Sequence, residues 1–387
     1  MRFHLVEDYK KLGFSSGLIS LWSGKLLLDF GTNIFGLFLP IVLYQQFGNF
    51  DALIIWYIAI SLGYFLLAPL GGNIINKIGL KASLLIGVFL RIPYFYGWYR
   101  FEEDPIFWMW VTAICLVLLR MTFWLPFQTD SAKFSSKRNR GKQFGVIFSL
   151  ASLFSIIAPV IGGFLMESWG FALLSFVSML VCILSIIPFW FLPHTKENMS
   201  WTYWETIKYF FHPFNRRMVT AYMSDGAVGT INTVFWPLFI FSVLDDRYQS
   251  VGLITGGVLL LGVVLRLFIG NLLDKFHKVR MVRWGTFLNS SAWLIKVLAA
   301  STVQVFLVSI YHTLALIVLR TSLDTLVYEK AADRGHYIDE YTLIREMAMH
   351  LGKVIVLCVV AGLLLIFPLQ ATFVLAAFAA LFITLLQ

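Results

Sequence analysis

The chain of 387 residues is 59% hydrophobic and only 13% charged, and its mean hydropathy is +0.80. Soluble domains are about 45–50% apolar and about 25% charged, so this composition excludes an ordinary soluble protein and predicts a multi-pass membrane protein. A net charge of +9 would also suit nucleic-acid binding. However, the basic residues are concentrated in alternate connections between apolar runs, which indicates membrane topology and no nucleic-acid partner.

Runs of about 20 mostly apolar residues are long enough to cross a bilayer as helices. We therefore expect an all-α membrane protein with twelve transmembrane helices, at 20–45, 52–74, 81–99, 105–127, 143–166, 170–193, 217–241, 249–273, 281–300, 303–327, 347–367 and 369–387. With the N-terminus in the cytoplasm, nearly all loop Lys and Arg residues lie on the cytoplasmic side, as the positive-inside bias requires. This distribution fixes the orientation, and we expect a multi-pass protein of the plasma (inner) membrane, surrounded by the lipid bilayer.

The first span carries a stripe of polar and small residues within an otherwise apolar helix. Residues spaced at i, i+4, i+7 and i+11 share one helical face, and here they are Asp29, Asn33, Gly36 and Pro40. Such a stripe normally faces protein or water rather than lipid, so we expect it to line an internal cavity. Lys25 lies one turn before Asp29 and either pairs with it in the cavity or extends to the inner interface.

The connection after the second span combines glycines with basic residues in the segment GGNIINKIGLK, residues 71–81. A small residue at a helix end allows two helices to approach closely, and a tight turn uses Gly where φ is positive. Basic residues anchor the loop at the cytoplasmic face, and a nearby amide or carboxylate can hydrogen-bond free backbone groups. The residues of this loop motif are Gly72, Asn76, Lys77, Gly79 and Lys81.

The loop motif recurs after the eighth span, in the segment GNLLDKFHKVR. The residues of this second copy are Gly270, Asp274, Lys275 and Arg280. A shift of 198 residues aligns the two copies and also places the Gly-Thr pair at 31–32 on that at 229–230. We infer two six-helix halves of parallel orientation, 1–193 and 217–387, joined by a cytoplasmic linker at 194–216. One copy alone would fit an ordinary positive-inside turn and a gating latch about equally well, whereas two at matching positions favour the latch.

The fifth span contains the segment APVIGG, in which a proline shortly precedes two adjacent glycines. The proline frees a backbone carbonyl, and the glycines admit a close neighbouring helix. The residues of this motif are Pro159, Gly162 and Gly163.

The two halves and their loop motifs resemble the major facilitator superfamily over the whole chain. The family's loop signature has Asp where this chain has Asn76, and His277 stands where the second copy would have Gly. The resemblance implies the fold of that family, with twelve helices in two pseudo-symmetric halves, helices 1, 4, 7 and 10 around a central cavity, and a functional monomer. The motif at Pro159 resembles a signature of the family's antiporters.

The four spans that this resemblance places around the cavity each carry one ionisable residue. They are Asp29, Arg120, Asp225 and Arg320. Because ionisable groups are costly in a bilayer, we expect them to couple proton movement to solute binding, together with Asn232 on the same face as Asp225. Alternatively, they are structural ion pairs that lock helices together.

Four other ionisable residues lie closer to the predicted span ends. Arg266 and Lys296 are expected to extend to the membrane interface, and His350 and Lys353 are interpreted as interfacial anchors.

These features favour a secondary active transporter over an enzyme. The first hypothesis is proton-driven export, by antiport, of a small amphipathic or organic molecule. The second is proton symport of a sugar or another polar nutrient, and a non-transporting receptor or membrane enzyme is an alternative of another class. Since the sequence has no Ser-His-Asp set, no HExxH segment, no nucleotide-binding loop and no metal-ligand cluster at bilayer depth, we expect no metal and no cofactor.

Overall fold

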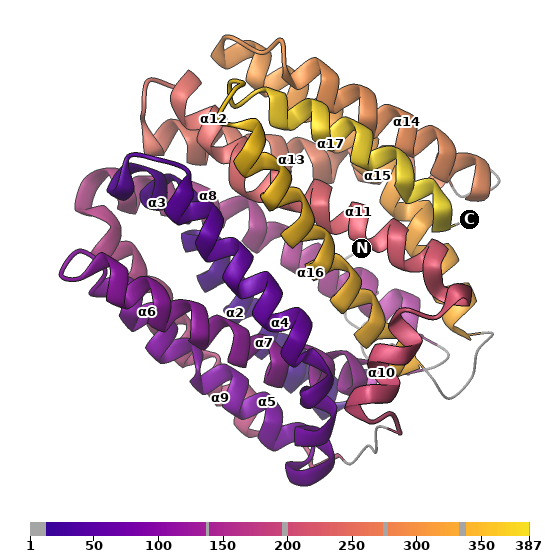
Figure 1. The fold of residues 1–387 in the computed structure, drawn as a ribbon. Coiled ribbons are helices and arrows are strands. Elements are labelled where there is room, and N and C mark those ends of the chain that lie inside the picture. Colours follow the sequence, from indigo (N-terminus) through magenta and orange to yellow (C-terminus); the bar gives the residue numbers. More distant parts are fainter. Residues whose placement is uncertain (1–12, 137–138, 196–199, 274–277, 333–337, 387) are drawn as a thin grey trace, which may run out of the picture.

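The computed structural model describes residues 13–136, 139–195, 200–273, 278–332 and 338–386, and within these ranges the chain is helical, without strands (Figure 1). Helices of the first half of the chain, indigo to magenta, lie together on one side, and those of the second half, orange to yellow, lie on the other. The first group is α2 (Ser16–Gly36), α3 (Leu39–Phe47), α4 (Asp51–Ile78), α5 (Leu80–Phe89), α6 (Arg91–Tyr99), α7 (Pro105–Phe134), α8 (Arg140–Leu184) and α9 (Ile186–Trp190).

A short helix, α10 (Tyr203–Phe210), lies between the two groups in sequence. The seventh span begins with the 3-10 turn η1 (Pro213–Asn215) and contains the π-helical turn η2 (Ile231–Phe235) between α11 (Arg216–Thr230) and α12 (Trp236–Val243). The remaining elements are α13 (Tyr248–Leu273), α14 (Lys278–Lys296), α15 (Thr302–Ala332), α16 (Ile338–Leu363), α17 (Ala371–Leu381) and the 3-10 turn η4 (Phe382–Leu386).

Nine helical segments of the described residues are long and apolar enough to cross a membrane. One of them, Lys142–Trp190, covers two expected spans, because the merged helix breaks at Gly170, whose φ of 77° suits glycine. The other two expected spans coincide with α14 and with the shorter apolar segment Ala371–Leu386. The all-helical membrane fold is therefore confirmed.

Polar side chains and prolines fix where several helices begin. The hydroxyl oxygen of Ser15 accepts the backbone N–H of Leu18 at 3.1 Å, which caps α2. Asp104 accepts the N–H of Phe107 at 3.1 Å, and Pro105 stands in the first turn of α7, where its missing N–H costs nothing. These caps set the starts of two helices that carry predicted site residues.

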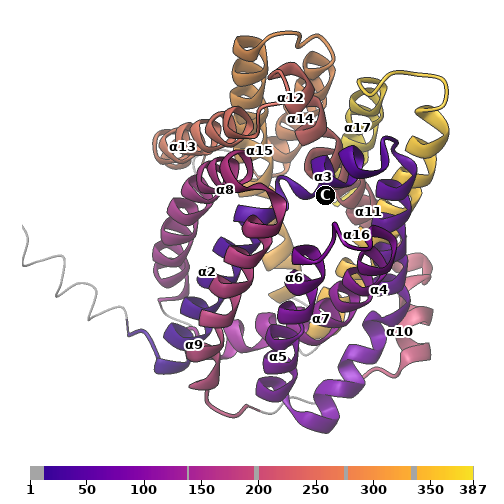
Figure 2. The same ribbon diagram turned by 90° about the vertical axis from the view of Figure 1, so that its left-hand side faces the viewer.

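The two groups of helices meet along α8 and α13, which lie side by side (Figures 1 and 2). A Cβ added at Gly252 would lie 2.3 Å from the carbonyl oxygen of Pro159, and one added at Gly163 would lie 2.7 Å from that of Tyr248. Gly162 meets α2 in the same way, since its Cβ would lie 2.2 Å from a backbone oxygen there. Backbone thus packs directly on backbone, which only residues without a side chain permit.

A second contact between the groups joins α4 to α16, and α10 packs against both of these helices. Phe210 of α10 is 2% exposed, and its ring lies 5.4 Å from that of Phe65, whereas Trp204 is 76% exposed. One face of α10 therefore packs on protein, and the other faces outward, as in an interfacial helix. The division of the chain at 194–216 stays a prediction.

The first loop motif forms a sharp break between α4 and α5. Gly79 stands at this break with a φ of 82°. Gly72 is buried within α4, Asn76 and Lys77 are exposed, and Lys81 is half-buried in α5. The positive φ explains the glycine at this turn.

The second loop motif is described only in part. Gly270 lies in α13, and Arg280 is an exposed residue of α14. Asp274 and Lys275 lie outside the described residues. The gating latch thus stays a prediction.

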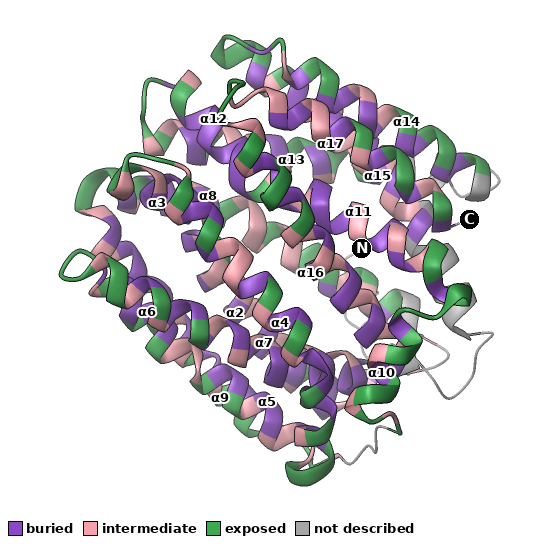
Figure 3. Ribbon diagram, in the orientation of Figure 1, coloured by how far each residue is buried: buried purple, intermediate pink, exposed green. Residues whose placement is uncertain are grey.

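Burial separates the inner and outer faces of the helices (Figure 3). Large apolar side chains on outward faces are strongly exposed, including Phe268 of α13 at 78%, Phe287 of α14 at 60% and Phe378 of α17 at 62%. Monomeric soluble proteins rarely expose wide apolar surfaces of this kind, so these faces are suited to lipid.

Candidate solute cavity

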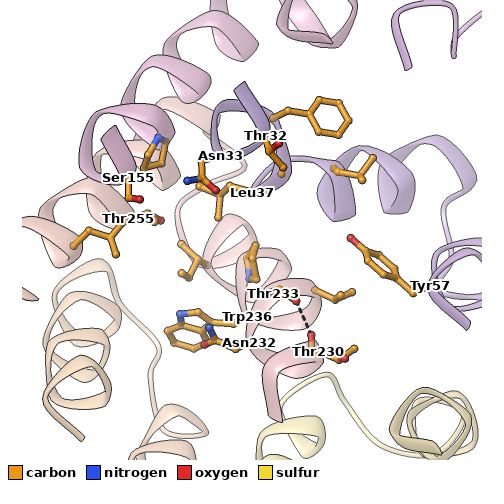
Figure 4. A pocket seen from close by; sticks show the side chains of 18 of the residues that line it. Thr32, Asn33, Leu37, Tyr57, Ser155, Thr230, Asn232, Thr233, Trp236 and Thr255 are labelled. Carbon is orange, nitrogen blue, oxygen red and sulfur yellow. Dashed lines mark hydrogen bonds between the residues drawn. The ribbon is translucent and has the colours of Figure 1, made fainter. Parts of the chain in front are cut away.

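A cavity of about 870 Å³ lies between the two groups of helices and is lined by residues of both. Thr32 and Asn33 enter it from α2, and Asn232, Thr233 and Trp236 enter it from the seventh span (Figure 4). Asn232 belongs to the π-helical turn η2, an irregularity that often marks functional positions in helices. The volume is within the range of about 300–1,000 Å³ found for small-molecule sites.

The predicted site residues divide into two sets around this cavity. Those that line it are Asn33, Arg120, Pro159, Asn232 and Arg320. Lys25, Asp29 and Asp225 are not part of its lining. Of the polar and small stripe on the first span, only Asn33 and Gly36 line the cavity, whereas Asp29 and Pro40 do not.

Asp225 and Arg320 form an ion pair between α11 and α15. The Nη1 of Arg320 donates to Oδ2 of Asp225 at 3.0 Å, and its Nη2 donates to Oδ1. The side chain of Asp225 is 6% exposed, whereas that of Arg320 is 40% exposed and lines the cavity. The carboxylate is thus shielded from the cavity by the guanidinium that holds it.

Lys25 and Asp29 pair within α2, with the ammonium of Lys25 2.5 Å from the carboxylate. The side chain of Lys25 is 11% exposed and lies over the ring of Trp124, 5.6 Å from its centroid, and over that of Phe127, at 5.4 Å. Since both charges belong to one helix, the pair does not tie two helices together.

Arg120 reaches from α7 to α16, across the two groups of helices. Its Nη1 lies 3.2 Å from Nε2 of His350, whose ring lies 4.4 Å from that of Tyr64. His350 is only 3% exposed, and Lys353, one turn further along α16, lines the cavity. The interpretation of these two residues as interfacial anchors is therefore wrong.

Lys296 is fully buried, at 0% exposed, so the prediction that it extends to the membrane interface is also wrong. Its ammonium lies 4.0 Å from the ring centroid of Trp236 and 3.9 Å from that of Trp293. It also lies 2.9 Å from Nδ1 of His312 and donates to Oδ1 of Asn232 at 3.4 Å. The aromatic faces and neutral acceptors replace the water that this cation loses.

Arg91 also lines the cavity, from the start of α6. Its Nη1 donates to the hydroxyl of Thr32 at 3.2 Å, and its guanidinium lies 5.2 Å from the ring centroid of Phe123. The buried Nε of Arg91 has no hydrogen-bond partner among the described residues.

We call Lys296, Asn232, His312 and Asn289 the Lys296 cluster. Two of its members could have indicated the cluster from the sequence, although the position of Lys296 near a span end favoured an interfacial lysine. His312 interrupts the apolar run 303–327, and Asn289 interrupts the preceding one. In the structure, Nε2 of His312 lies 2.9 Å from Oδ1 of Asn289. Polar residues within apolar spans normally face the protein interior. The sequence therefore allowed the prediction that His312 and Asn289 share one interior site.

The chemistry of this region is that of ion pairing and hydrogen bonding. Within the described residues, no group of three or more His, Cys, Asp and Glu side chains could hold a metal ion. The cavity instead combines hydroxyl, amide and guanidinium groups with aromatic rings. Such a site can bind and orient a small solute.

Comparison with solved structures shows a similar fold in peptide transporters of the POT family. A POT family transporter in complex with 5-aminolevulinic acid has a TM-score of 0.73 at 11% sequence identity, over 95% of this chain and 94% of that one. A mutant of peptide transporter POT in complex with alafosfalin has a TM-score of 0.72 at 11% identity, over 95% and 93%. Peptide transporter POT in complex with sulfate has a TM-score of 0.70 at 13% identity, over the same shares.

No curated protein matches this chain in sequence. The family model of the Major Facilitator Superfamily matches residues 21–339, which is most of the chain. Both the helical architecture and the fold of the similar structures agree with this match. The chain belongs to the Major Facilitator Superfamily of membrane transporters.

Proposed function

We propose that this protein is a proton-coupled secondary active transporter that works by alternating access as a monomer in the plasma membrane. The observation that carries the proposal is the Asp225–Arg320 pair at the cavity wall. A carboxylate takes up a proton when its cationic partner moves away and releases it when the pair forms again. Exchange of partners between Asp225, a proton and the solute would link proton movement to solute movement. None of these steps makes or breaks a covalent bond of the solute, so the protein is not an enzyme.

The proposed solute is a small amphipathic or organic molecule, and the proposed direction is export by antiport. The cavity supports an amphipathic or organic solute because it combines polar groups with Trp56, Tyr57 and Trp236. Complexes of similar transporters with alafosfalin and 5-aminolevulinic acid are consistent with a small organic solute. The motif at Pro159, which lines the cavity, supports antiport by its resemblance to an antiporter signature.

Symport of a polar nutrient is the second candidate, and the Asp225–Arg320 pair itself favours it. If a solute draws Arg320 away from Asp225, the carboxylate gains a proton as the solute binds. Solute and proton would then bind together and move in the same direction.

Solute-evoked proton movement in proteoliposomes tests the proposal and separates the two candidates. Solutes are added outside vesicles that contain a trapped pH dye, with the membrane potential clamped by potassium and valinomycin. Antiport makes the lumen more alkaline as solute enters, and symport makes it more acidic. Solute uptake without a change of luminal pH would contradict proton coupling altogether.

A further inference from the structure

The charged side chains that line the cavity are all basic within the described residues. They are Arg91, Arg120, Arg266, Arg320 and Lys353, and no Asp or Glu side chain of the described ranges contributes to the lining. Of these five, Arg320 forms an ion pair with a carboxylate, that of Asp225, which is not itself part of the cavity lining. The space in which we place the solute therefore has an excess of positive charge.

Arg91, Arg120 and Lys353 form no ion pair with a carboxylate among the described residues, and the charges of Arg120 and Lys353 are close enough to interact with each other. Arg91 donates to the hydroxyl of Thr32, and Arg120 contacts the ring of His350 at 3.2 Å. Lys353 follows His350 by three residues on α16, which places it on the same side of that helix. Cations at such depth are costly unless another charge compensates them.

The nearest acidic side chains are Glu346 and Asp225, whose charges act on Lys353, and that of Glu346 also on Arg120, but both are hydrogen-bonded to other cations. Glu346 accepts a hydrogen bond from Nη2 of Arg345 at 3.0 Å and is not part of the cavity lining. Asp225 is held by both Nη atoms of Arg320. Neither carboxylate forms an ion pair with Arg91, Arg120 or Lys353 within the part of the chain that the structure describes.

We propose that the transported solute is a small organic anion whose carboxylate, phosphonate or sulfonate group binds between Arg120 and Lys353. This inference rests on the proposed transport function and specifies its solute. A guanidinium presents two parallel N–H groups to an oxyanion, and the ammonium supplies a further donor. The two cations come from different halves of the chain, Arg120 from α7 and Lys353 from α16. One anionic group would therefore contact both halves at once.

The remaining lining suits an apolar or aromatic body attached to the anionic group. Trp56, Tyr57 and Tyr94 line the cavity from the first half of the chain, and Trp236 lines it from the second. A volume of about 870 Å³ leaves room for a body larger than an inorganic anion. Charge and shape together thus favour amphipathic anions over sugars and over organic cations.

Binding of matched solutes to the purified full-length chain tests this proposal. The panel contains aryl and alkyl carboxylates, phosphonates and sulfonates, each with its neutral amide or ester and with the amine of the same carbon skeleton. Ligand-induced thermal shift and tryptophan fluorescence report binding without any ion gradient. We expect binding by anionic members and at least about tenfold weaker binding by their neutral and cationic analogues. Equal or tighter binding of the analogues, or no binding by any anion, would overturn the proposal.

Variants locate the anion within the cavity. Arg120→Gln and Lys353→Gln are each expected to weaken anion binding about tenfold or more, and Arg120→Lys to retain part of it. Arg247→Gln is the matched control, because Arg247 is exposed and does not line the cavity. Anion affinities that stay at the wild-type value in folded Lys353→Gln and Arg120→Lys would contradict the assignment even if Arg120→Gln does not fold.

The outcome is separable from that of the proposed transport function. Selective anion binding without proton-driven flux would reject the transport mechanism and keep the binding site. Proton-driven flux of a neutral or cationic solute would keep the transport mechanism and reject the anion.

Discussion

Arg320 holds Asp225 with both Nη atoms, one of them at 3.0 Å, so that a nearly buried carboxylate lies behind a guanidinium of the cavity wall. The two residues come from α11 and α15, the seventh and tenth spans. Movement of Arg320 would therefore change the environment of a carboxylate that water reaches poorly.

Asp225→Asn should abolish proton coupling, because an amide cannot take up and release a proton at this site. We expect proton-driven flux in proteoliposomes to fall about tenfold or more. Exchange of solute without a gradient should continue, since it needs no net proton movement. Asp225→Glu, which keeps an ionisable group, is the control. Full proton-driven flux in the Asn variant would exclude Asp225 as the coupling residue.

Asp225 and Arg320 illustrate what the sequence allows one to predict. Both were recognisable as ionisable residues within apolar spans, because such residues are costly in a bilayer. Ion pairing among the four residues was open as an alternative, but which residues pair was not predictable, since it depends on how closely two helices approach, and no spacing within either helix encodes that distance. Asp29, selected by the same reasoning, pairs with Lys25 of its own helix instead.

Gly252→Ala should separate α8 from α13 and destabilise the protein. The new Cβ would lie 2.3 Å from the carbonyl oxygen of Pro159, and a backbone atom cannot yield as a flexible side chain does. Overpacking of this kind costs about 1–3 kcal/mol. We expect a lower midpoint of thermal unfolding in detergent.

Gly145→Ala is the matched control on α8, because a Cβ there meets nothing within 4 Å. Since Ala favours helix over Gly by about 1 kcal/mol, this variant should be neutral or slightly stabilising. If both alanine variants unfold at the same temperature, close packing of α8 on α13 does not contribute to stability.

The Lys296 cluster shows where prediction from sequence reached its limit. Lys296 and Arg266 both lie near the ends of apolar runs, which predicts that both extend to the membrane interface. In the structure, Lys296 is buried, and Arg266 is exposed but lines the cavity. Burial of Lys296 depends on Trp236, which is far away in sequence and enters from the seventh span. Partners supplied by tertiary contacts leave no local pattern around the lysine.

A double-mutant cycle should detect the contact between Lys296 and Trp293, whose ring centroid is 3.9 Å from the ammonium. We expect Lys296→Met and Trp293→Leu to be coupled by about 0.5–2 kcal/mol in the free energy of unfolding. The control cycle combines Lys296→Met with Trp284→Leu, because Trp284 belongs to the same helix but is 57% exposed. Equal coupling in the two cycles would show that the cation–π contact contributes nothing specific.

Stability of the interfacial helix α10 should decrease at low pH because of Glu205. Its carboxylate accepts hydrogen bonds from the backbone N–H and the hydroxyl of Thr202, both at 2.8 Å, and these bonds hold the pKa of Glu205 below its usual range. A carboxyl group with a lowered pKa in the folded state stabilises that state above its unfolded pKa, and the contribution is lost as pH falls through the folded pKa.

Hydrogen–deuterium exchange of α10, corrected for intrinsic exchange rates, measures this effect. Protection of its backbone amides in the wild type should fall between about neutral pH and about pH 3, where carboxyl groups become protonated. Glu205→Gln keeps an acceptor for the capping box but cannot ionise, so its protection should change little over the same range. Since Glu205 is exposed, the pH effect should also diminish at high salt. If protection falls equally in the wild type and in Glu205→Gln, another group controls the acid sensitivity of α10.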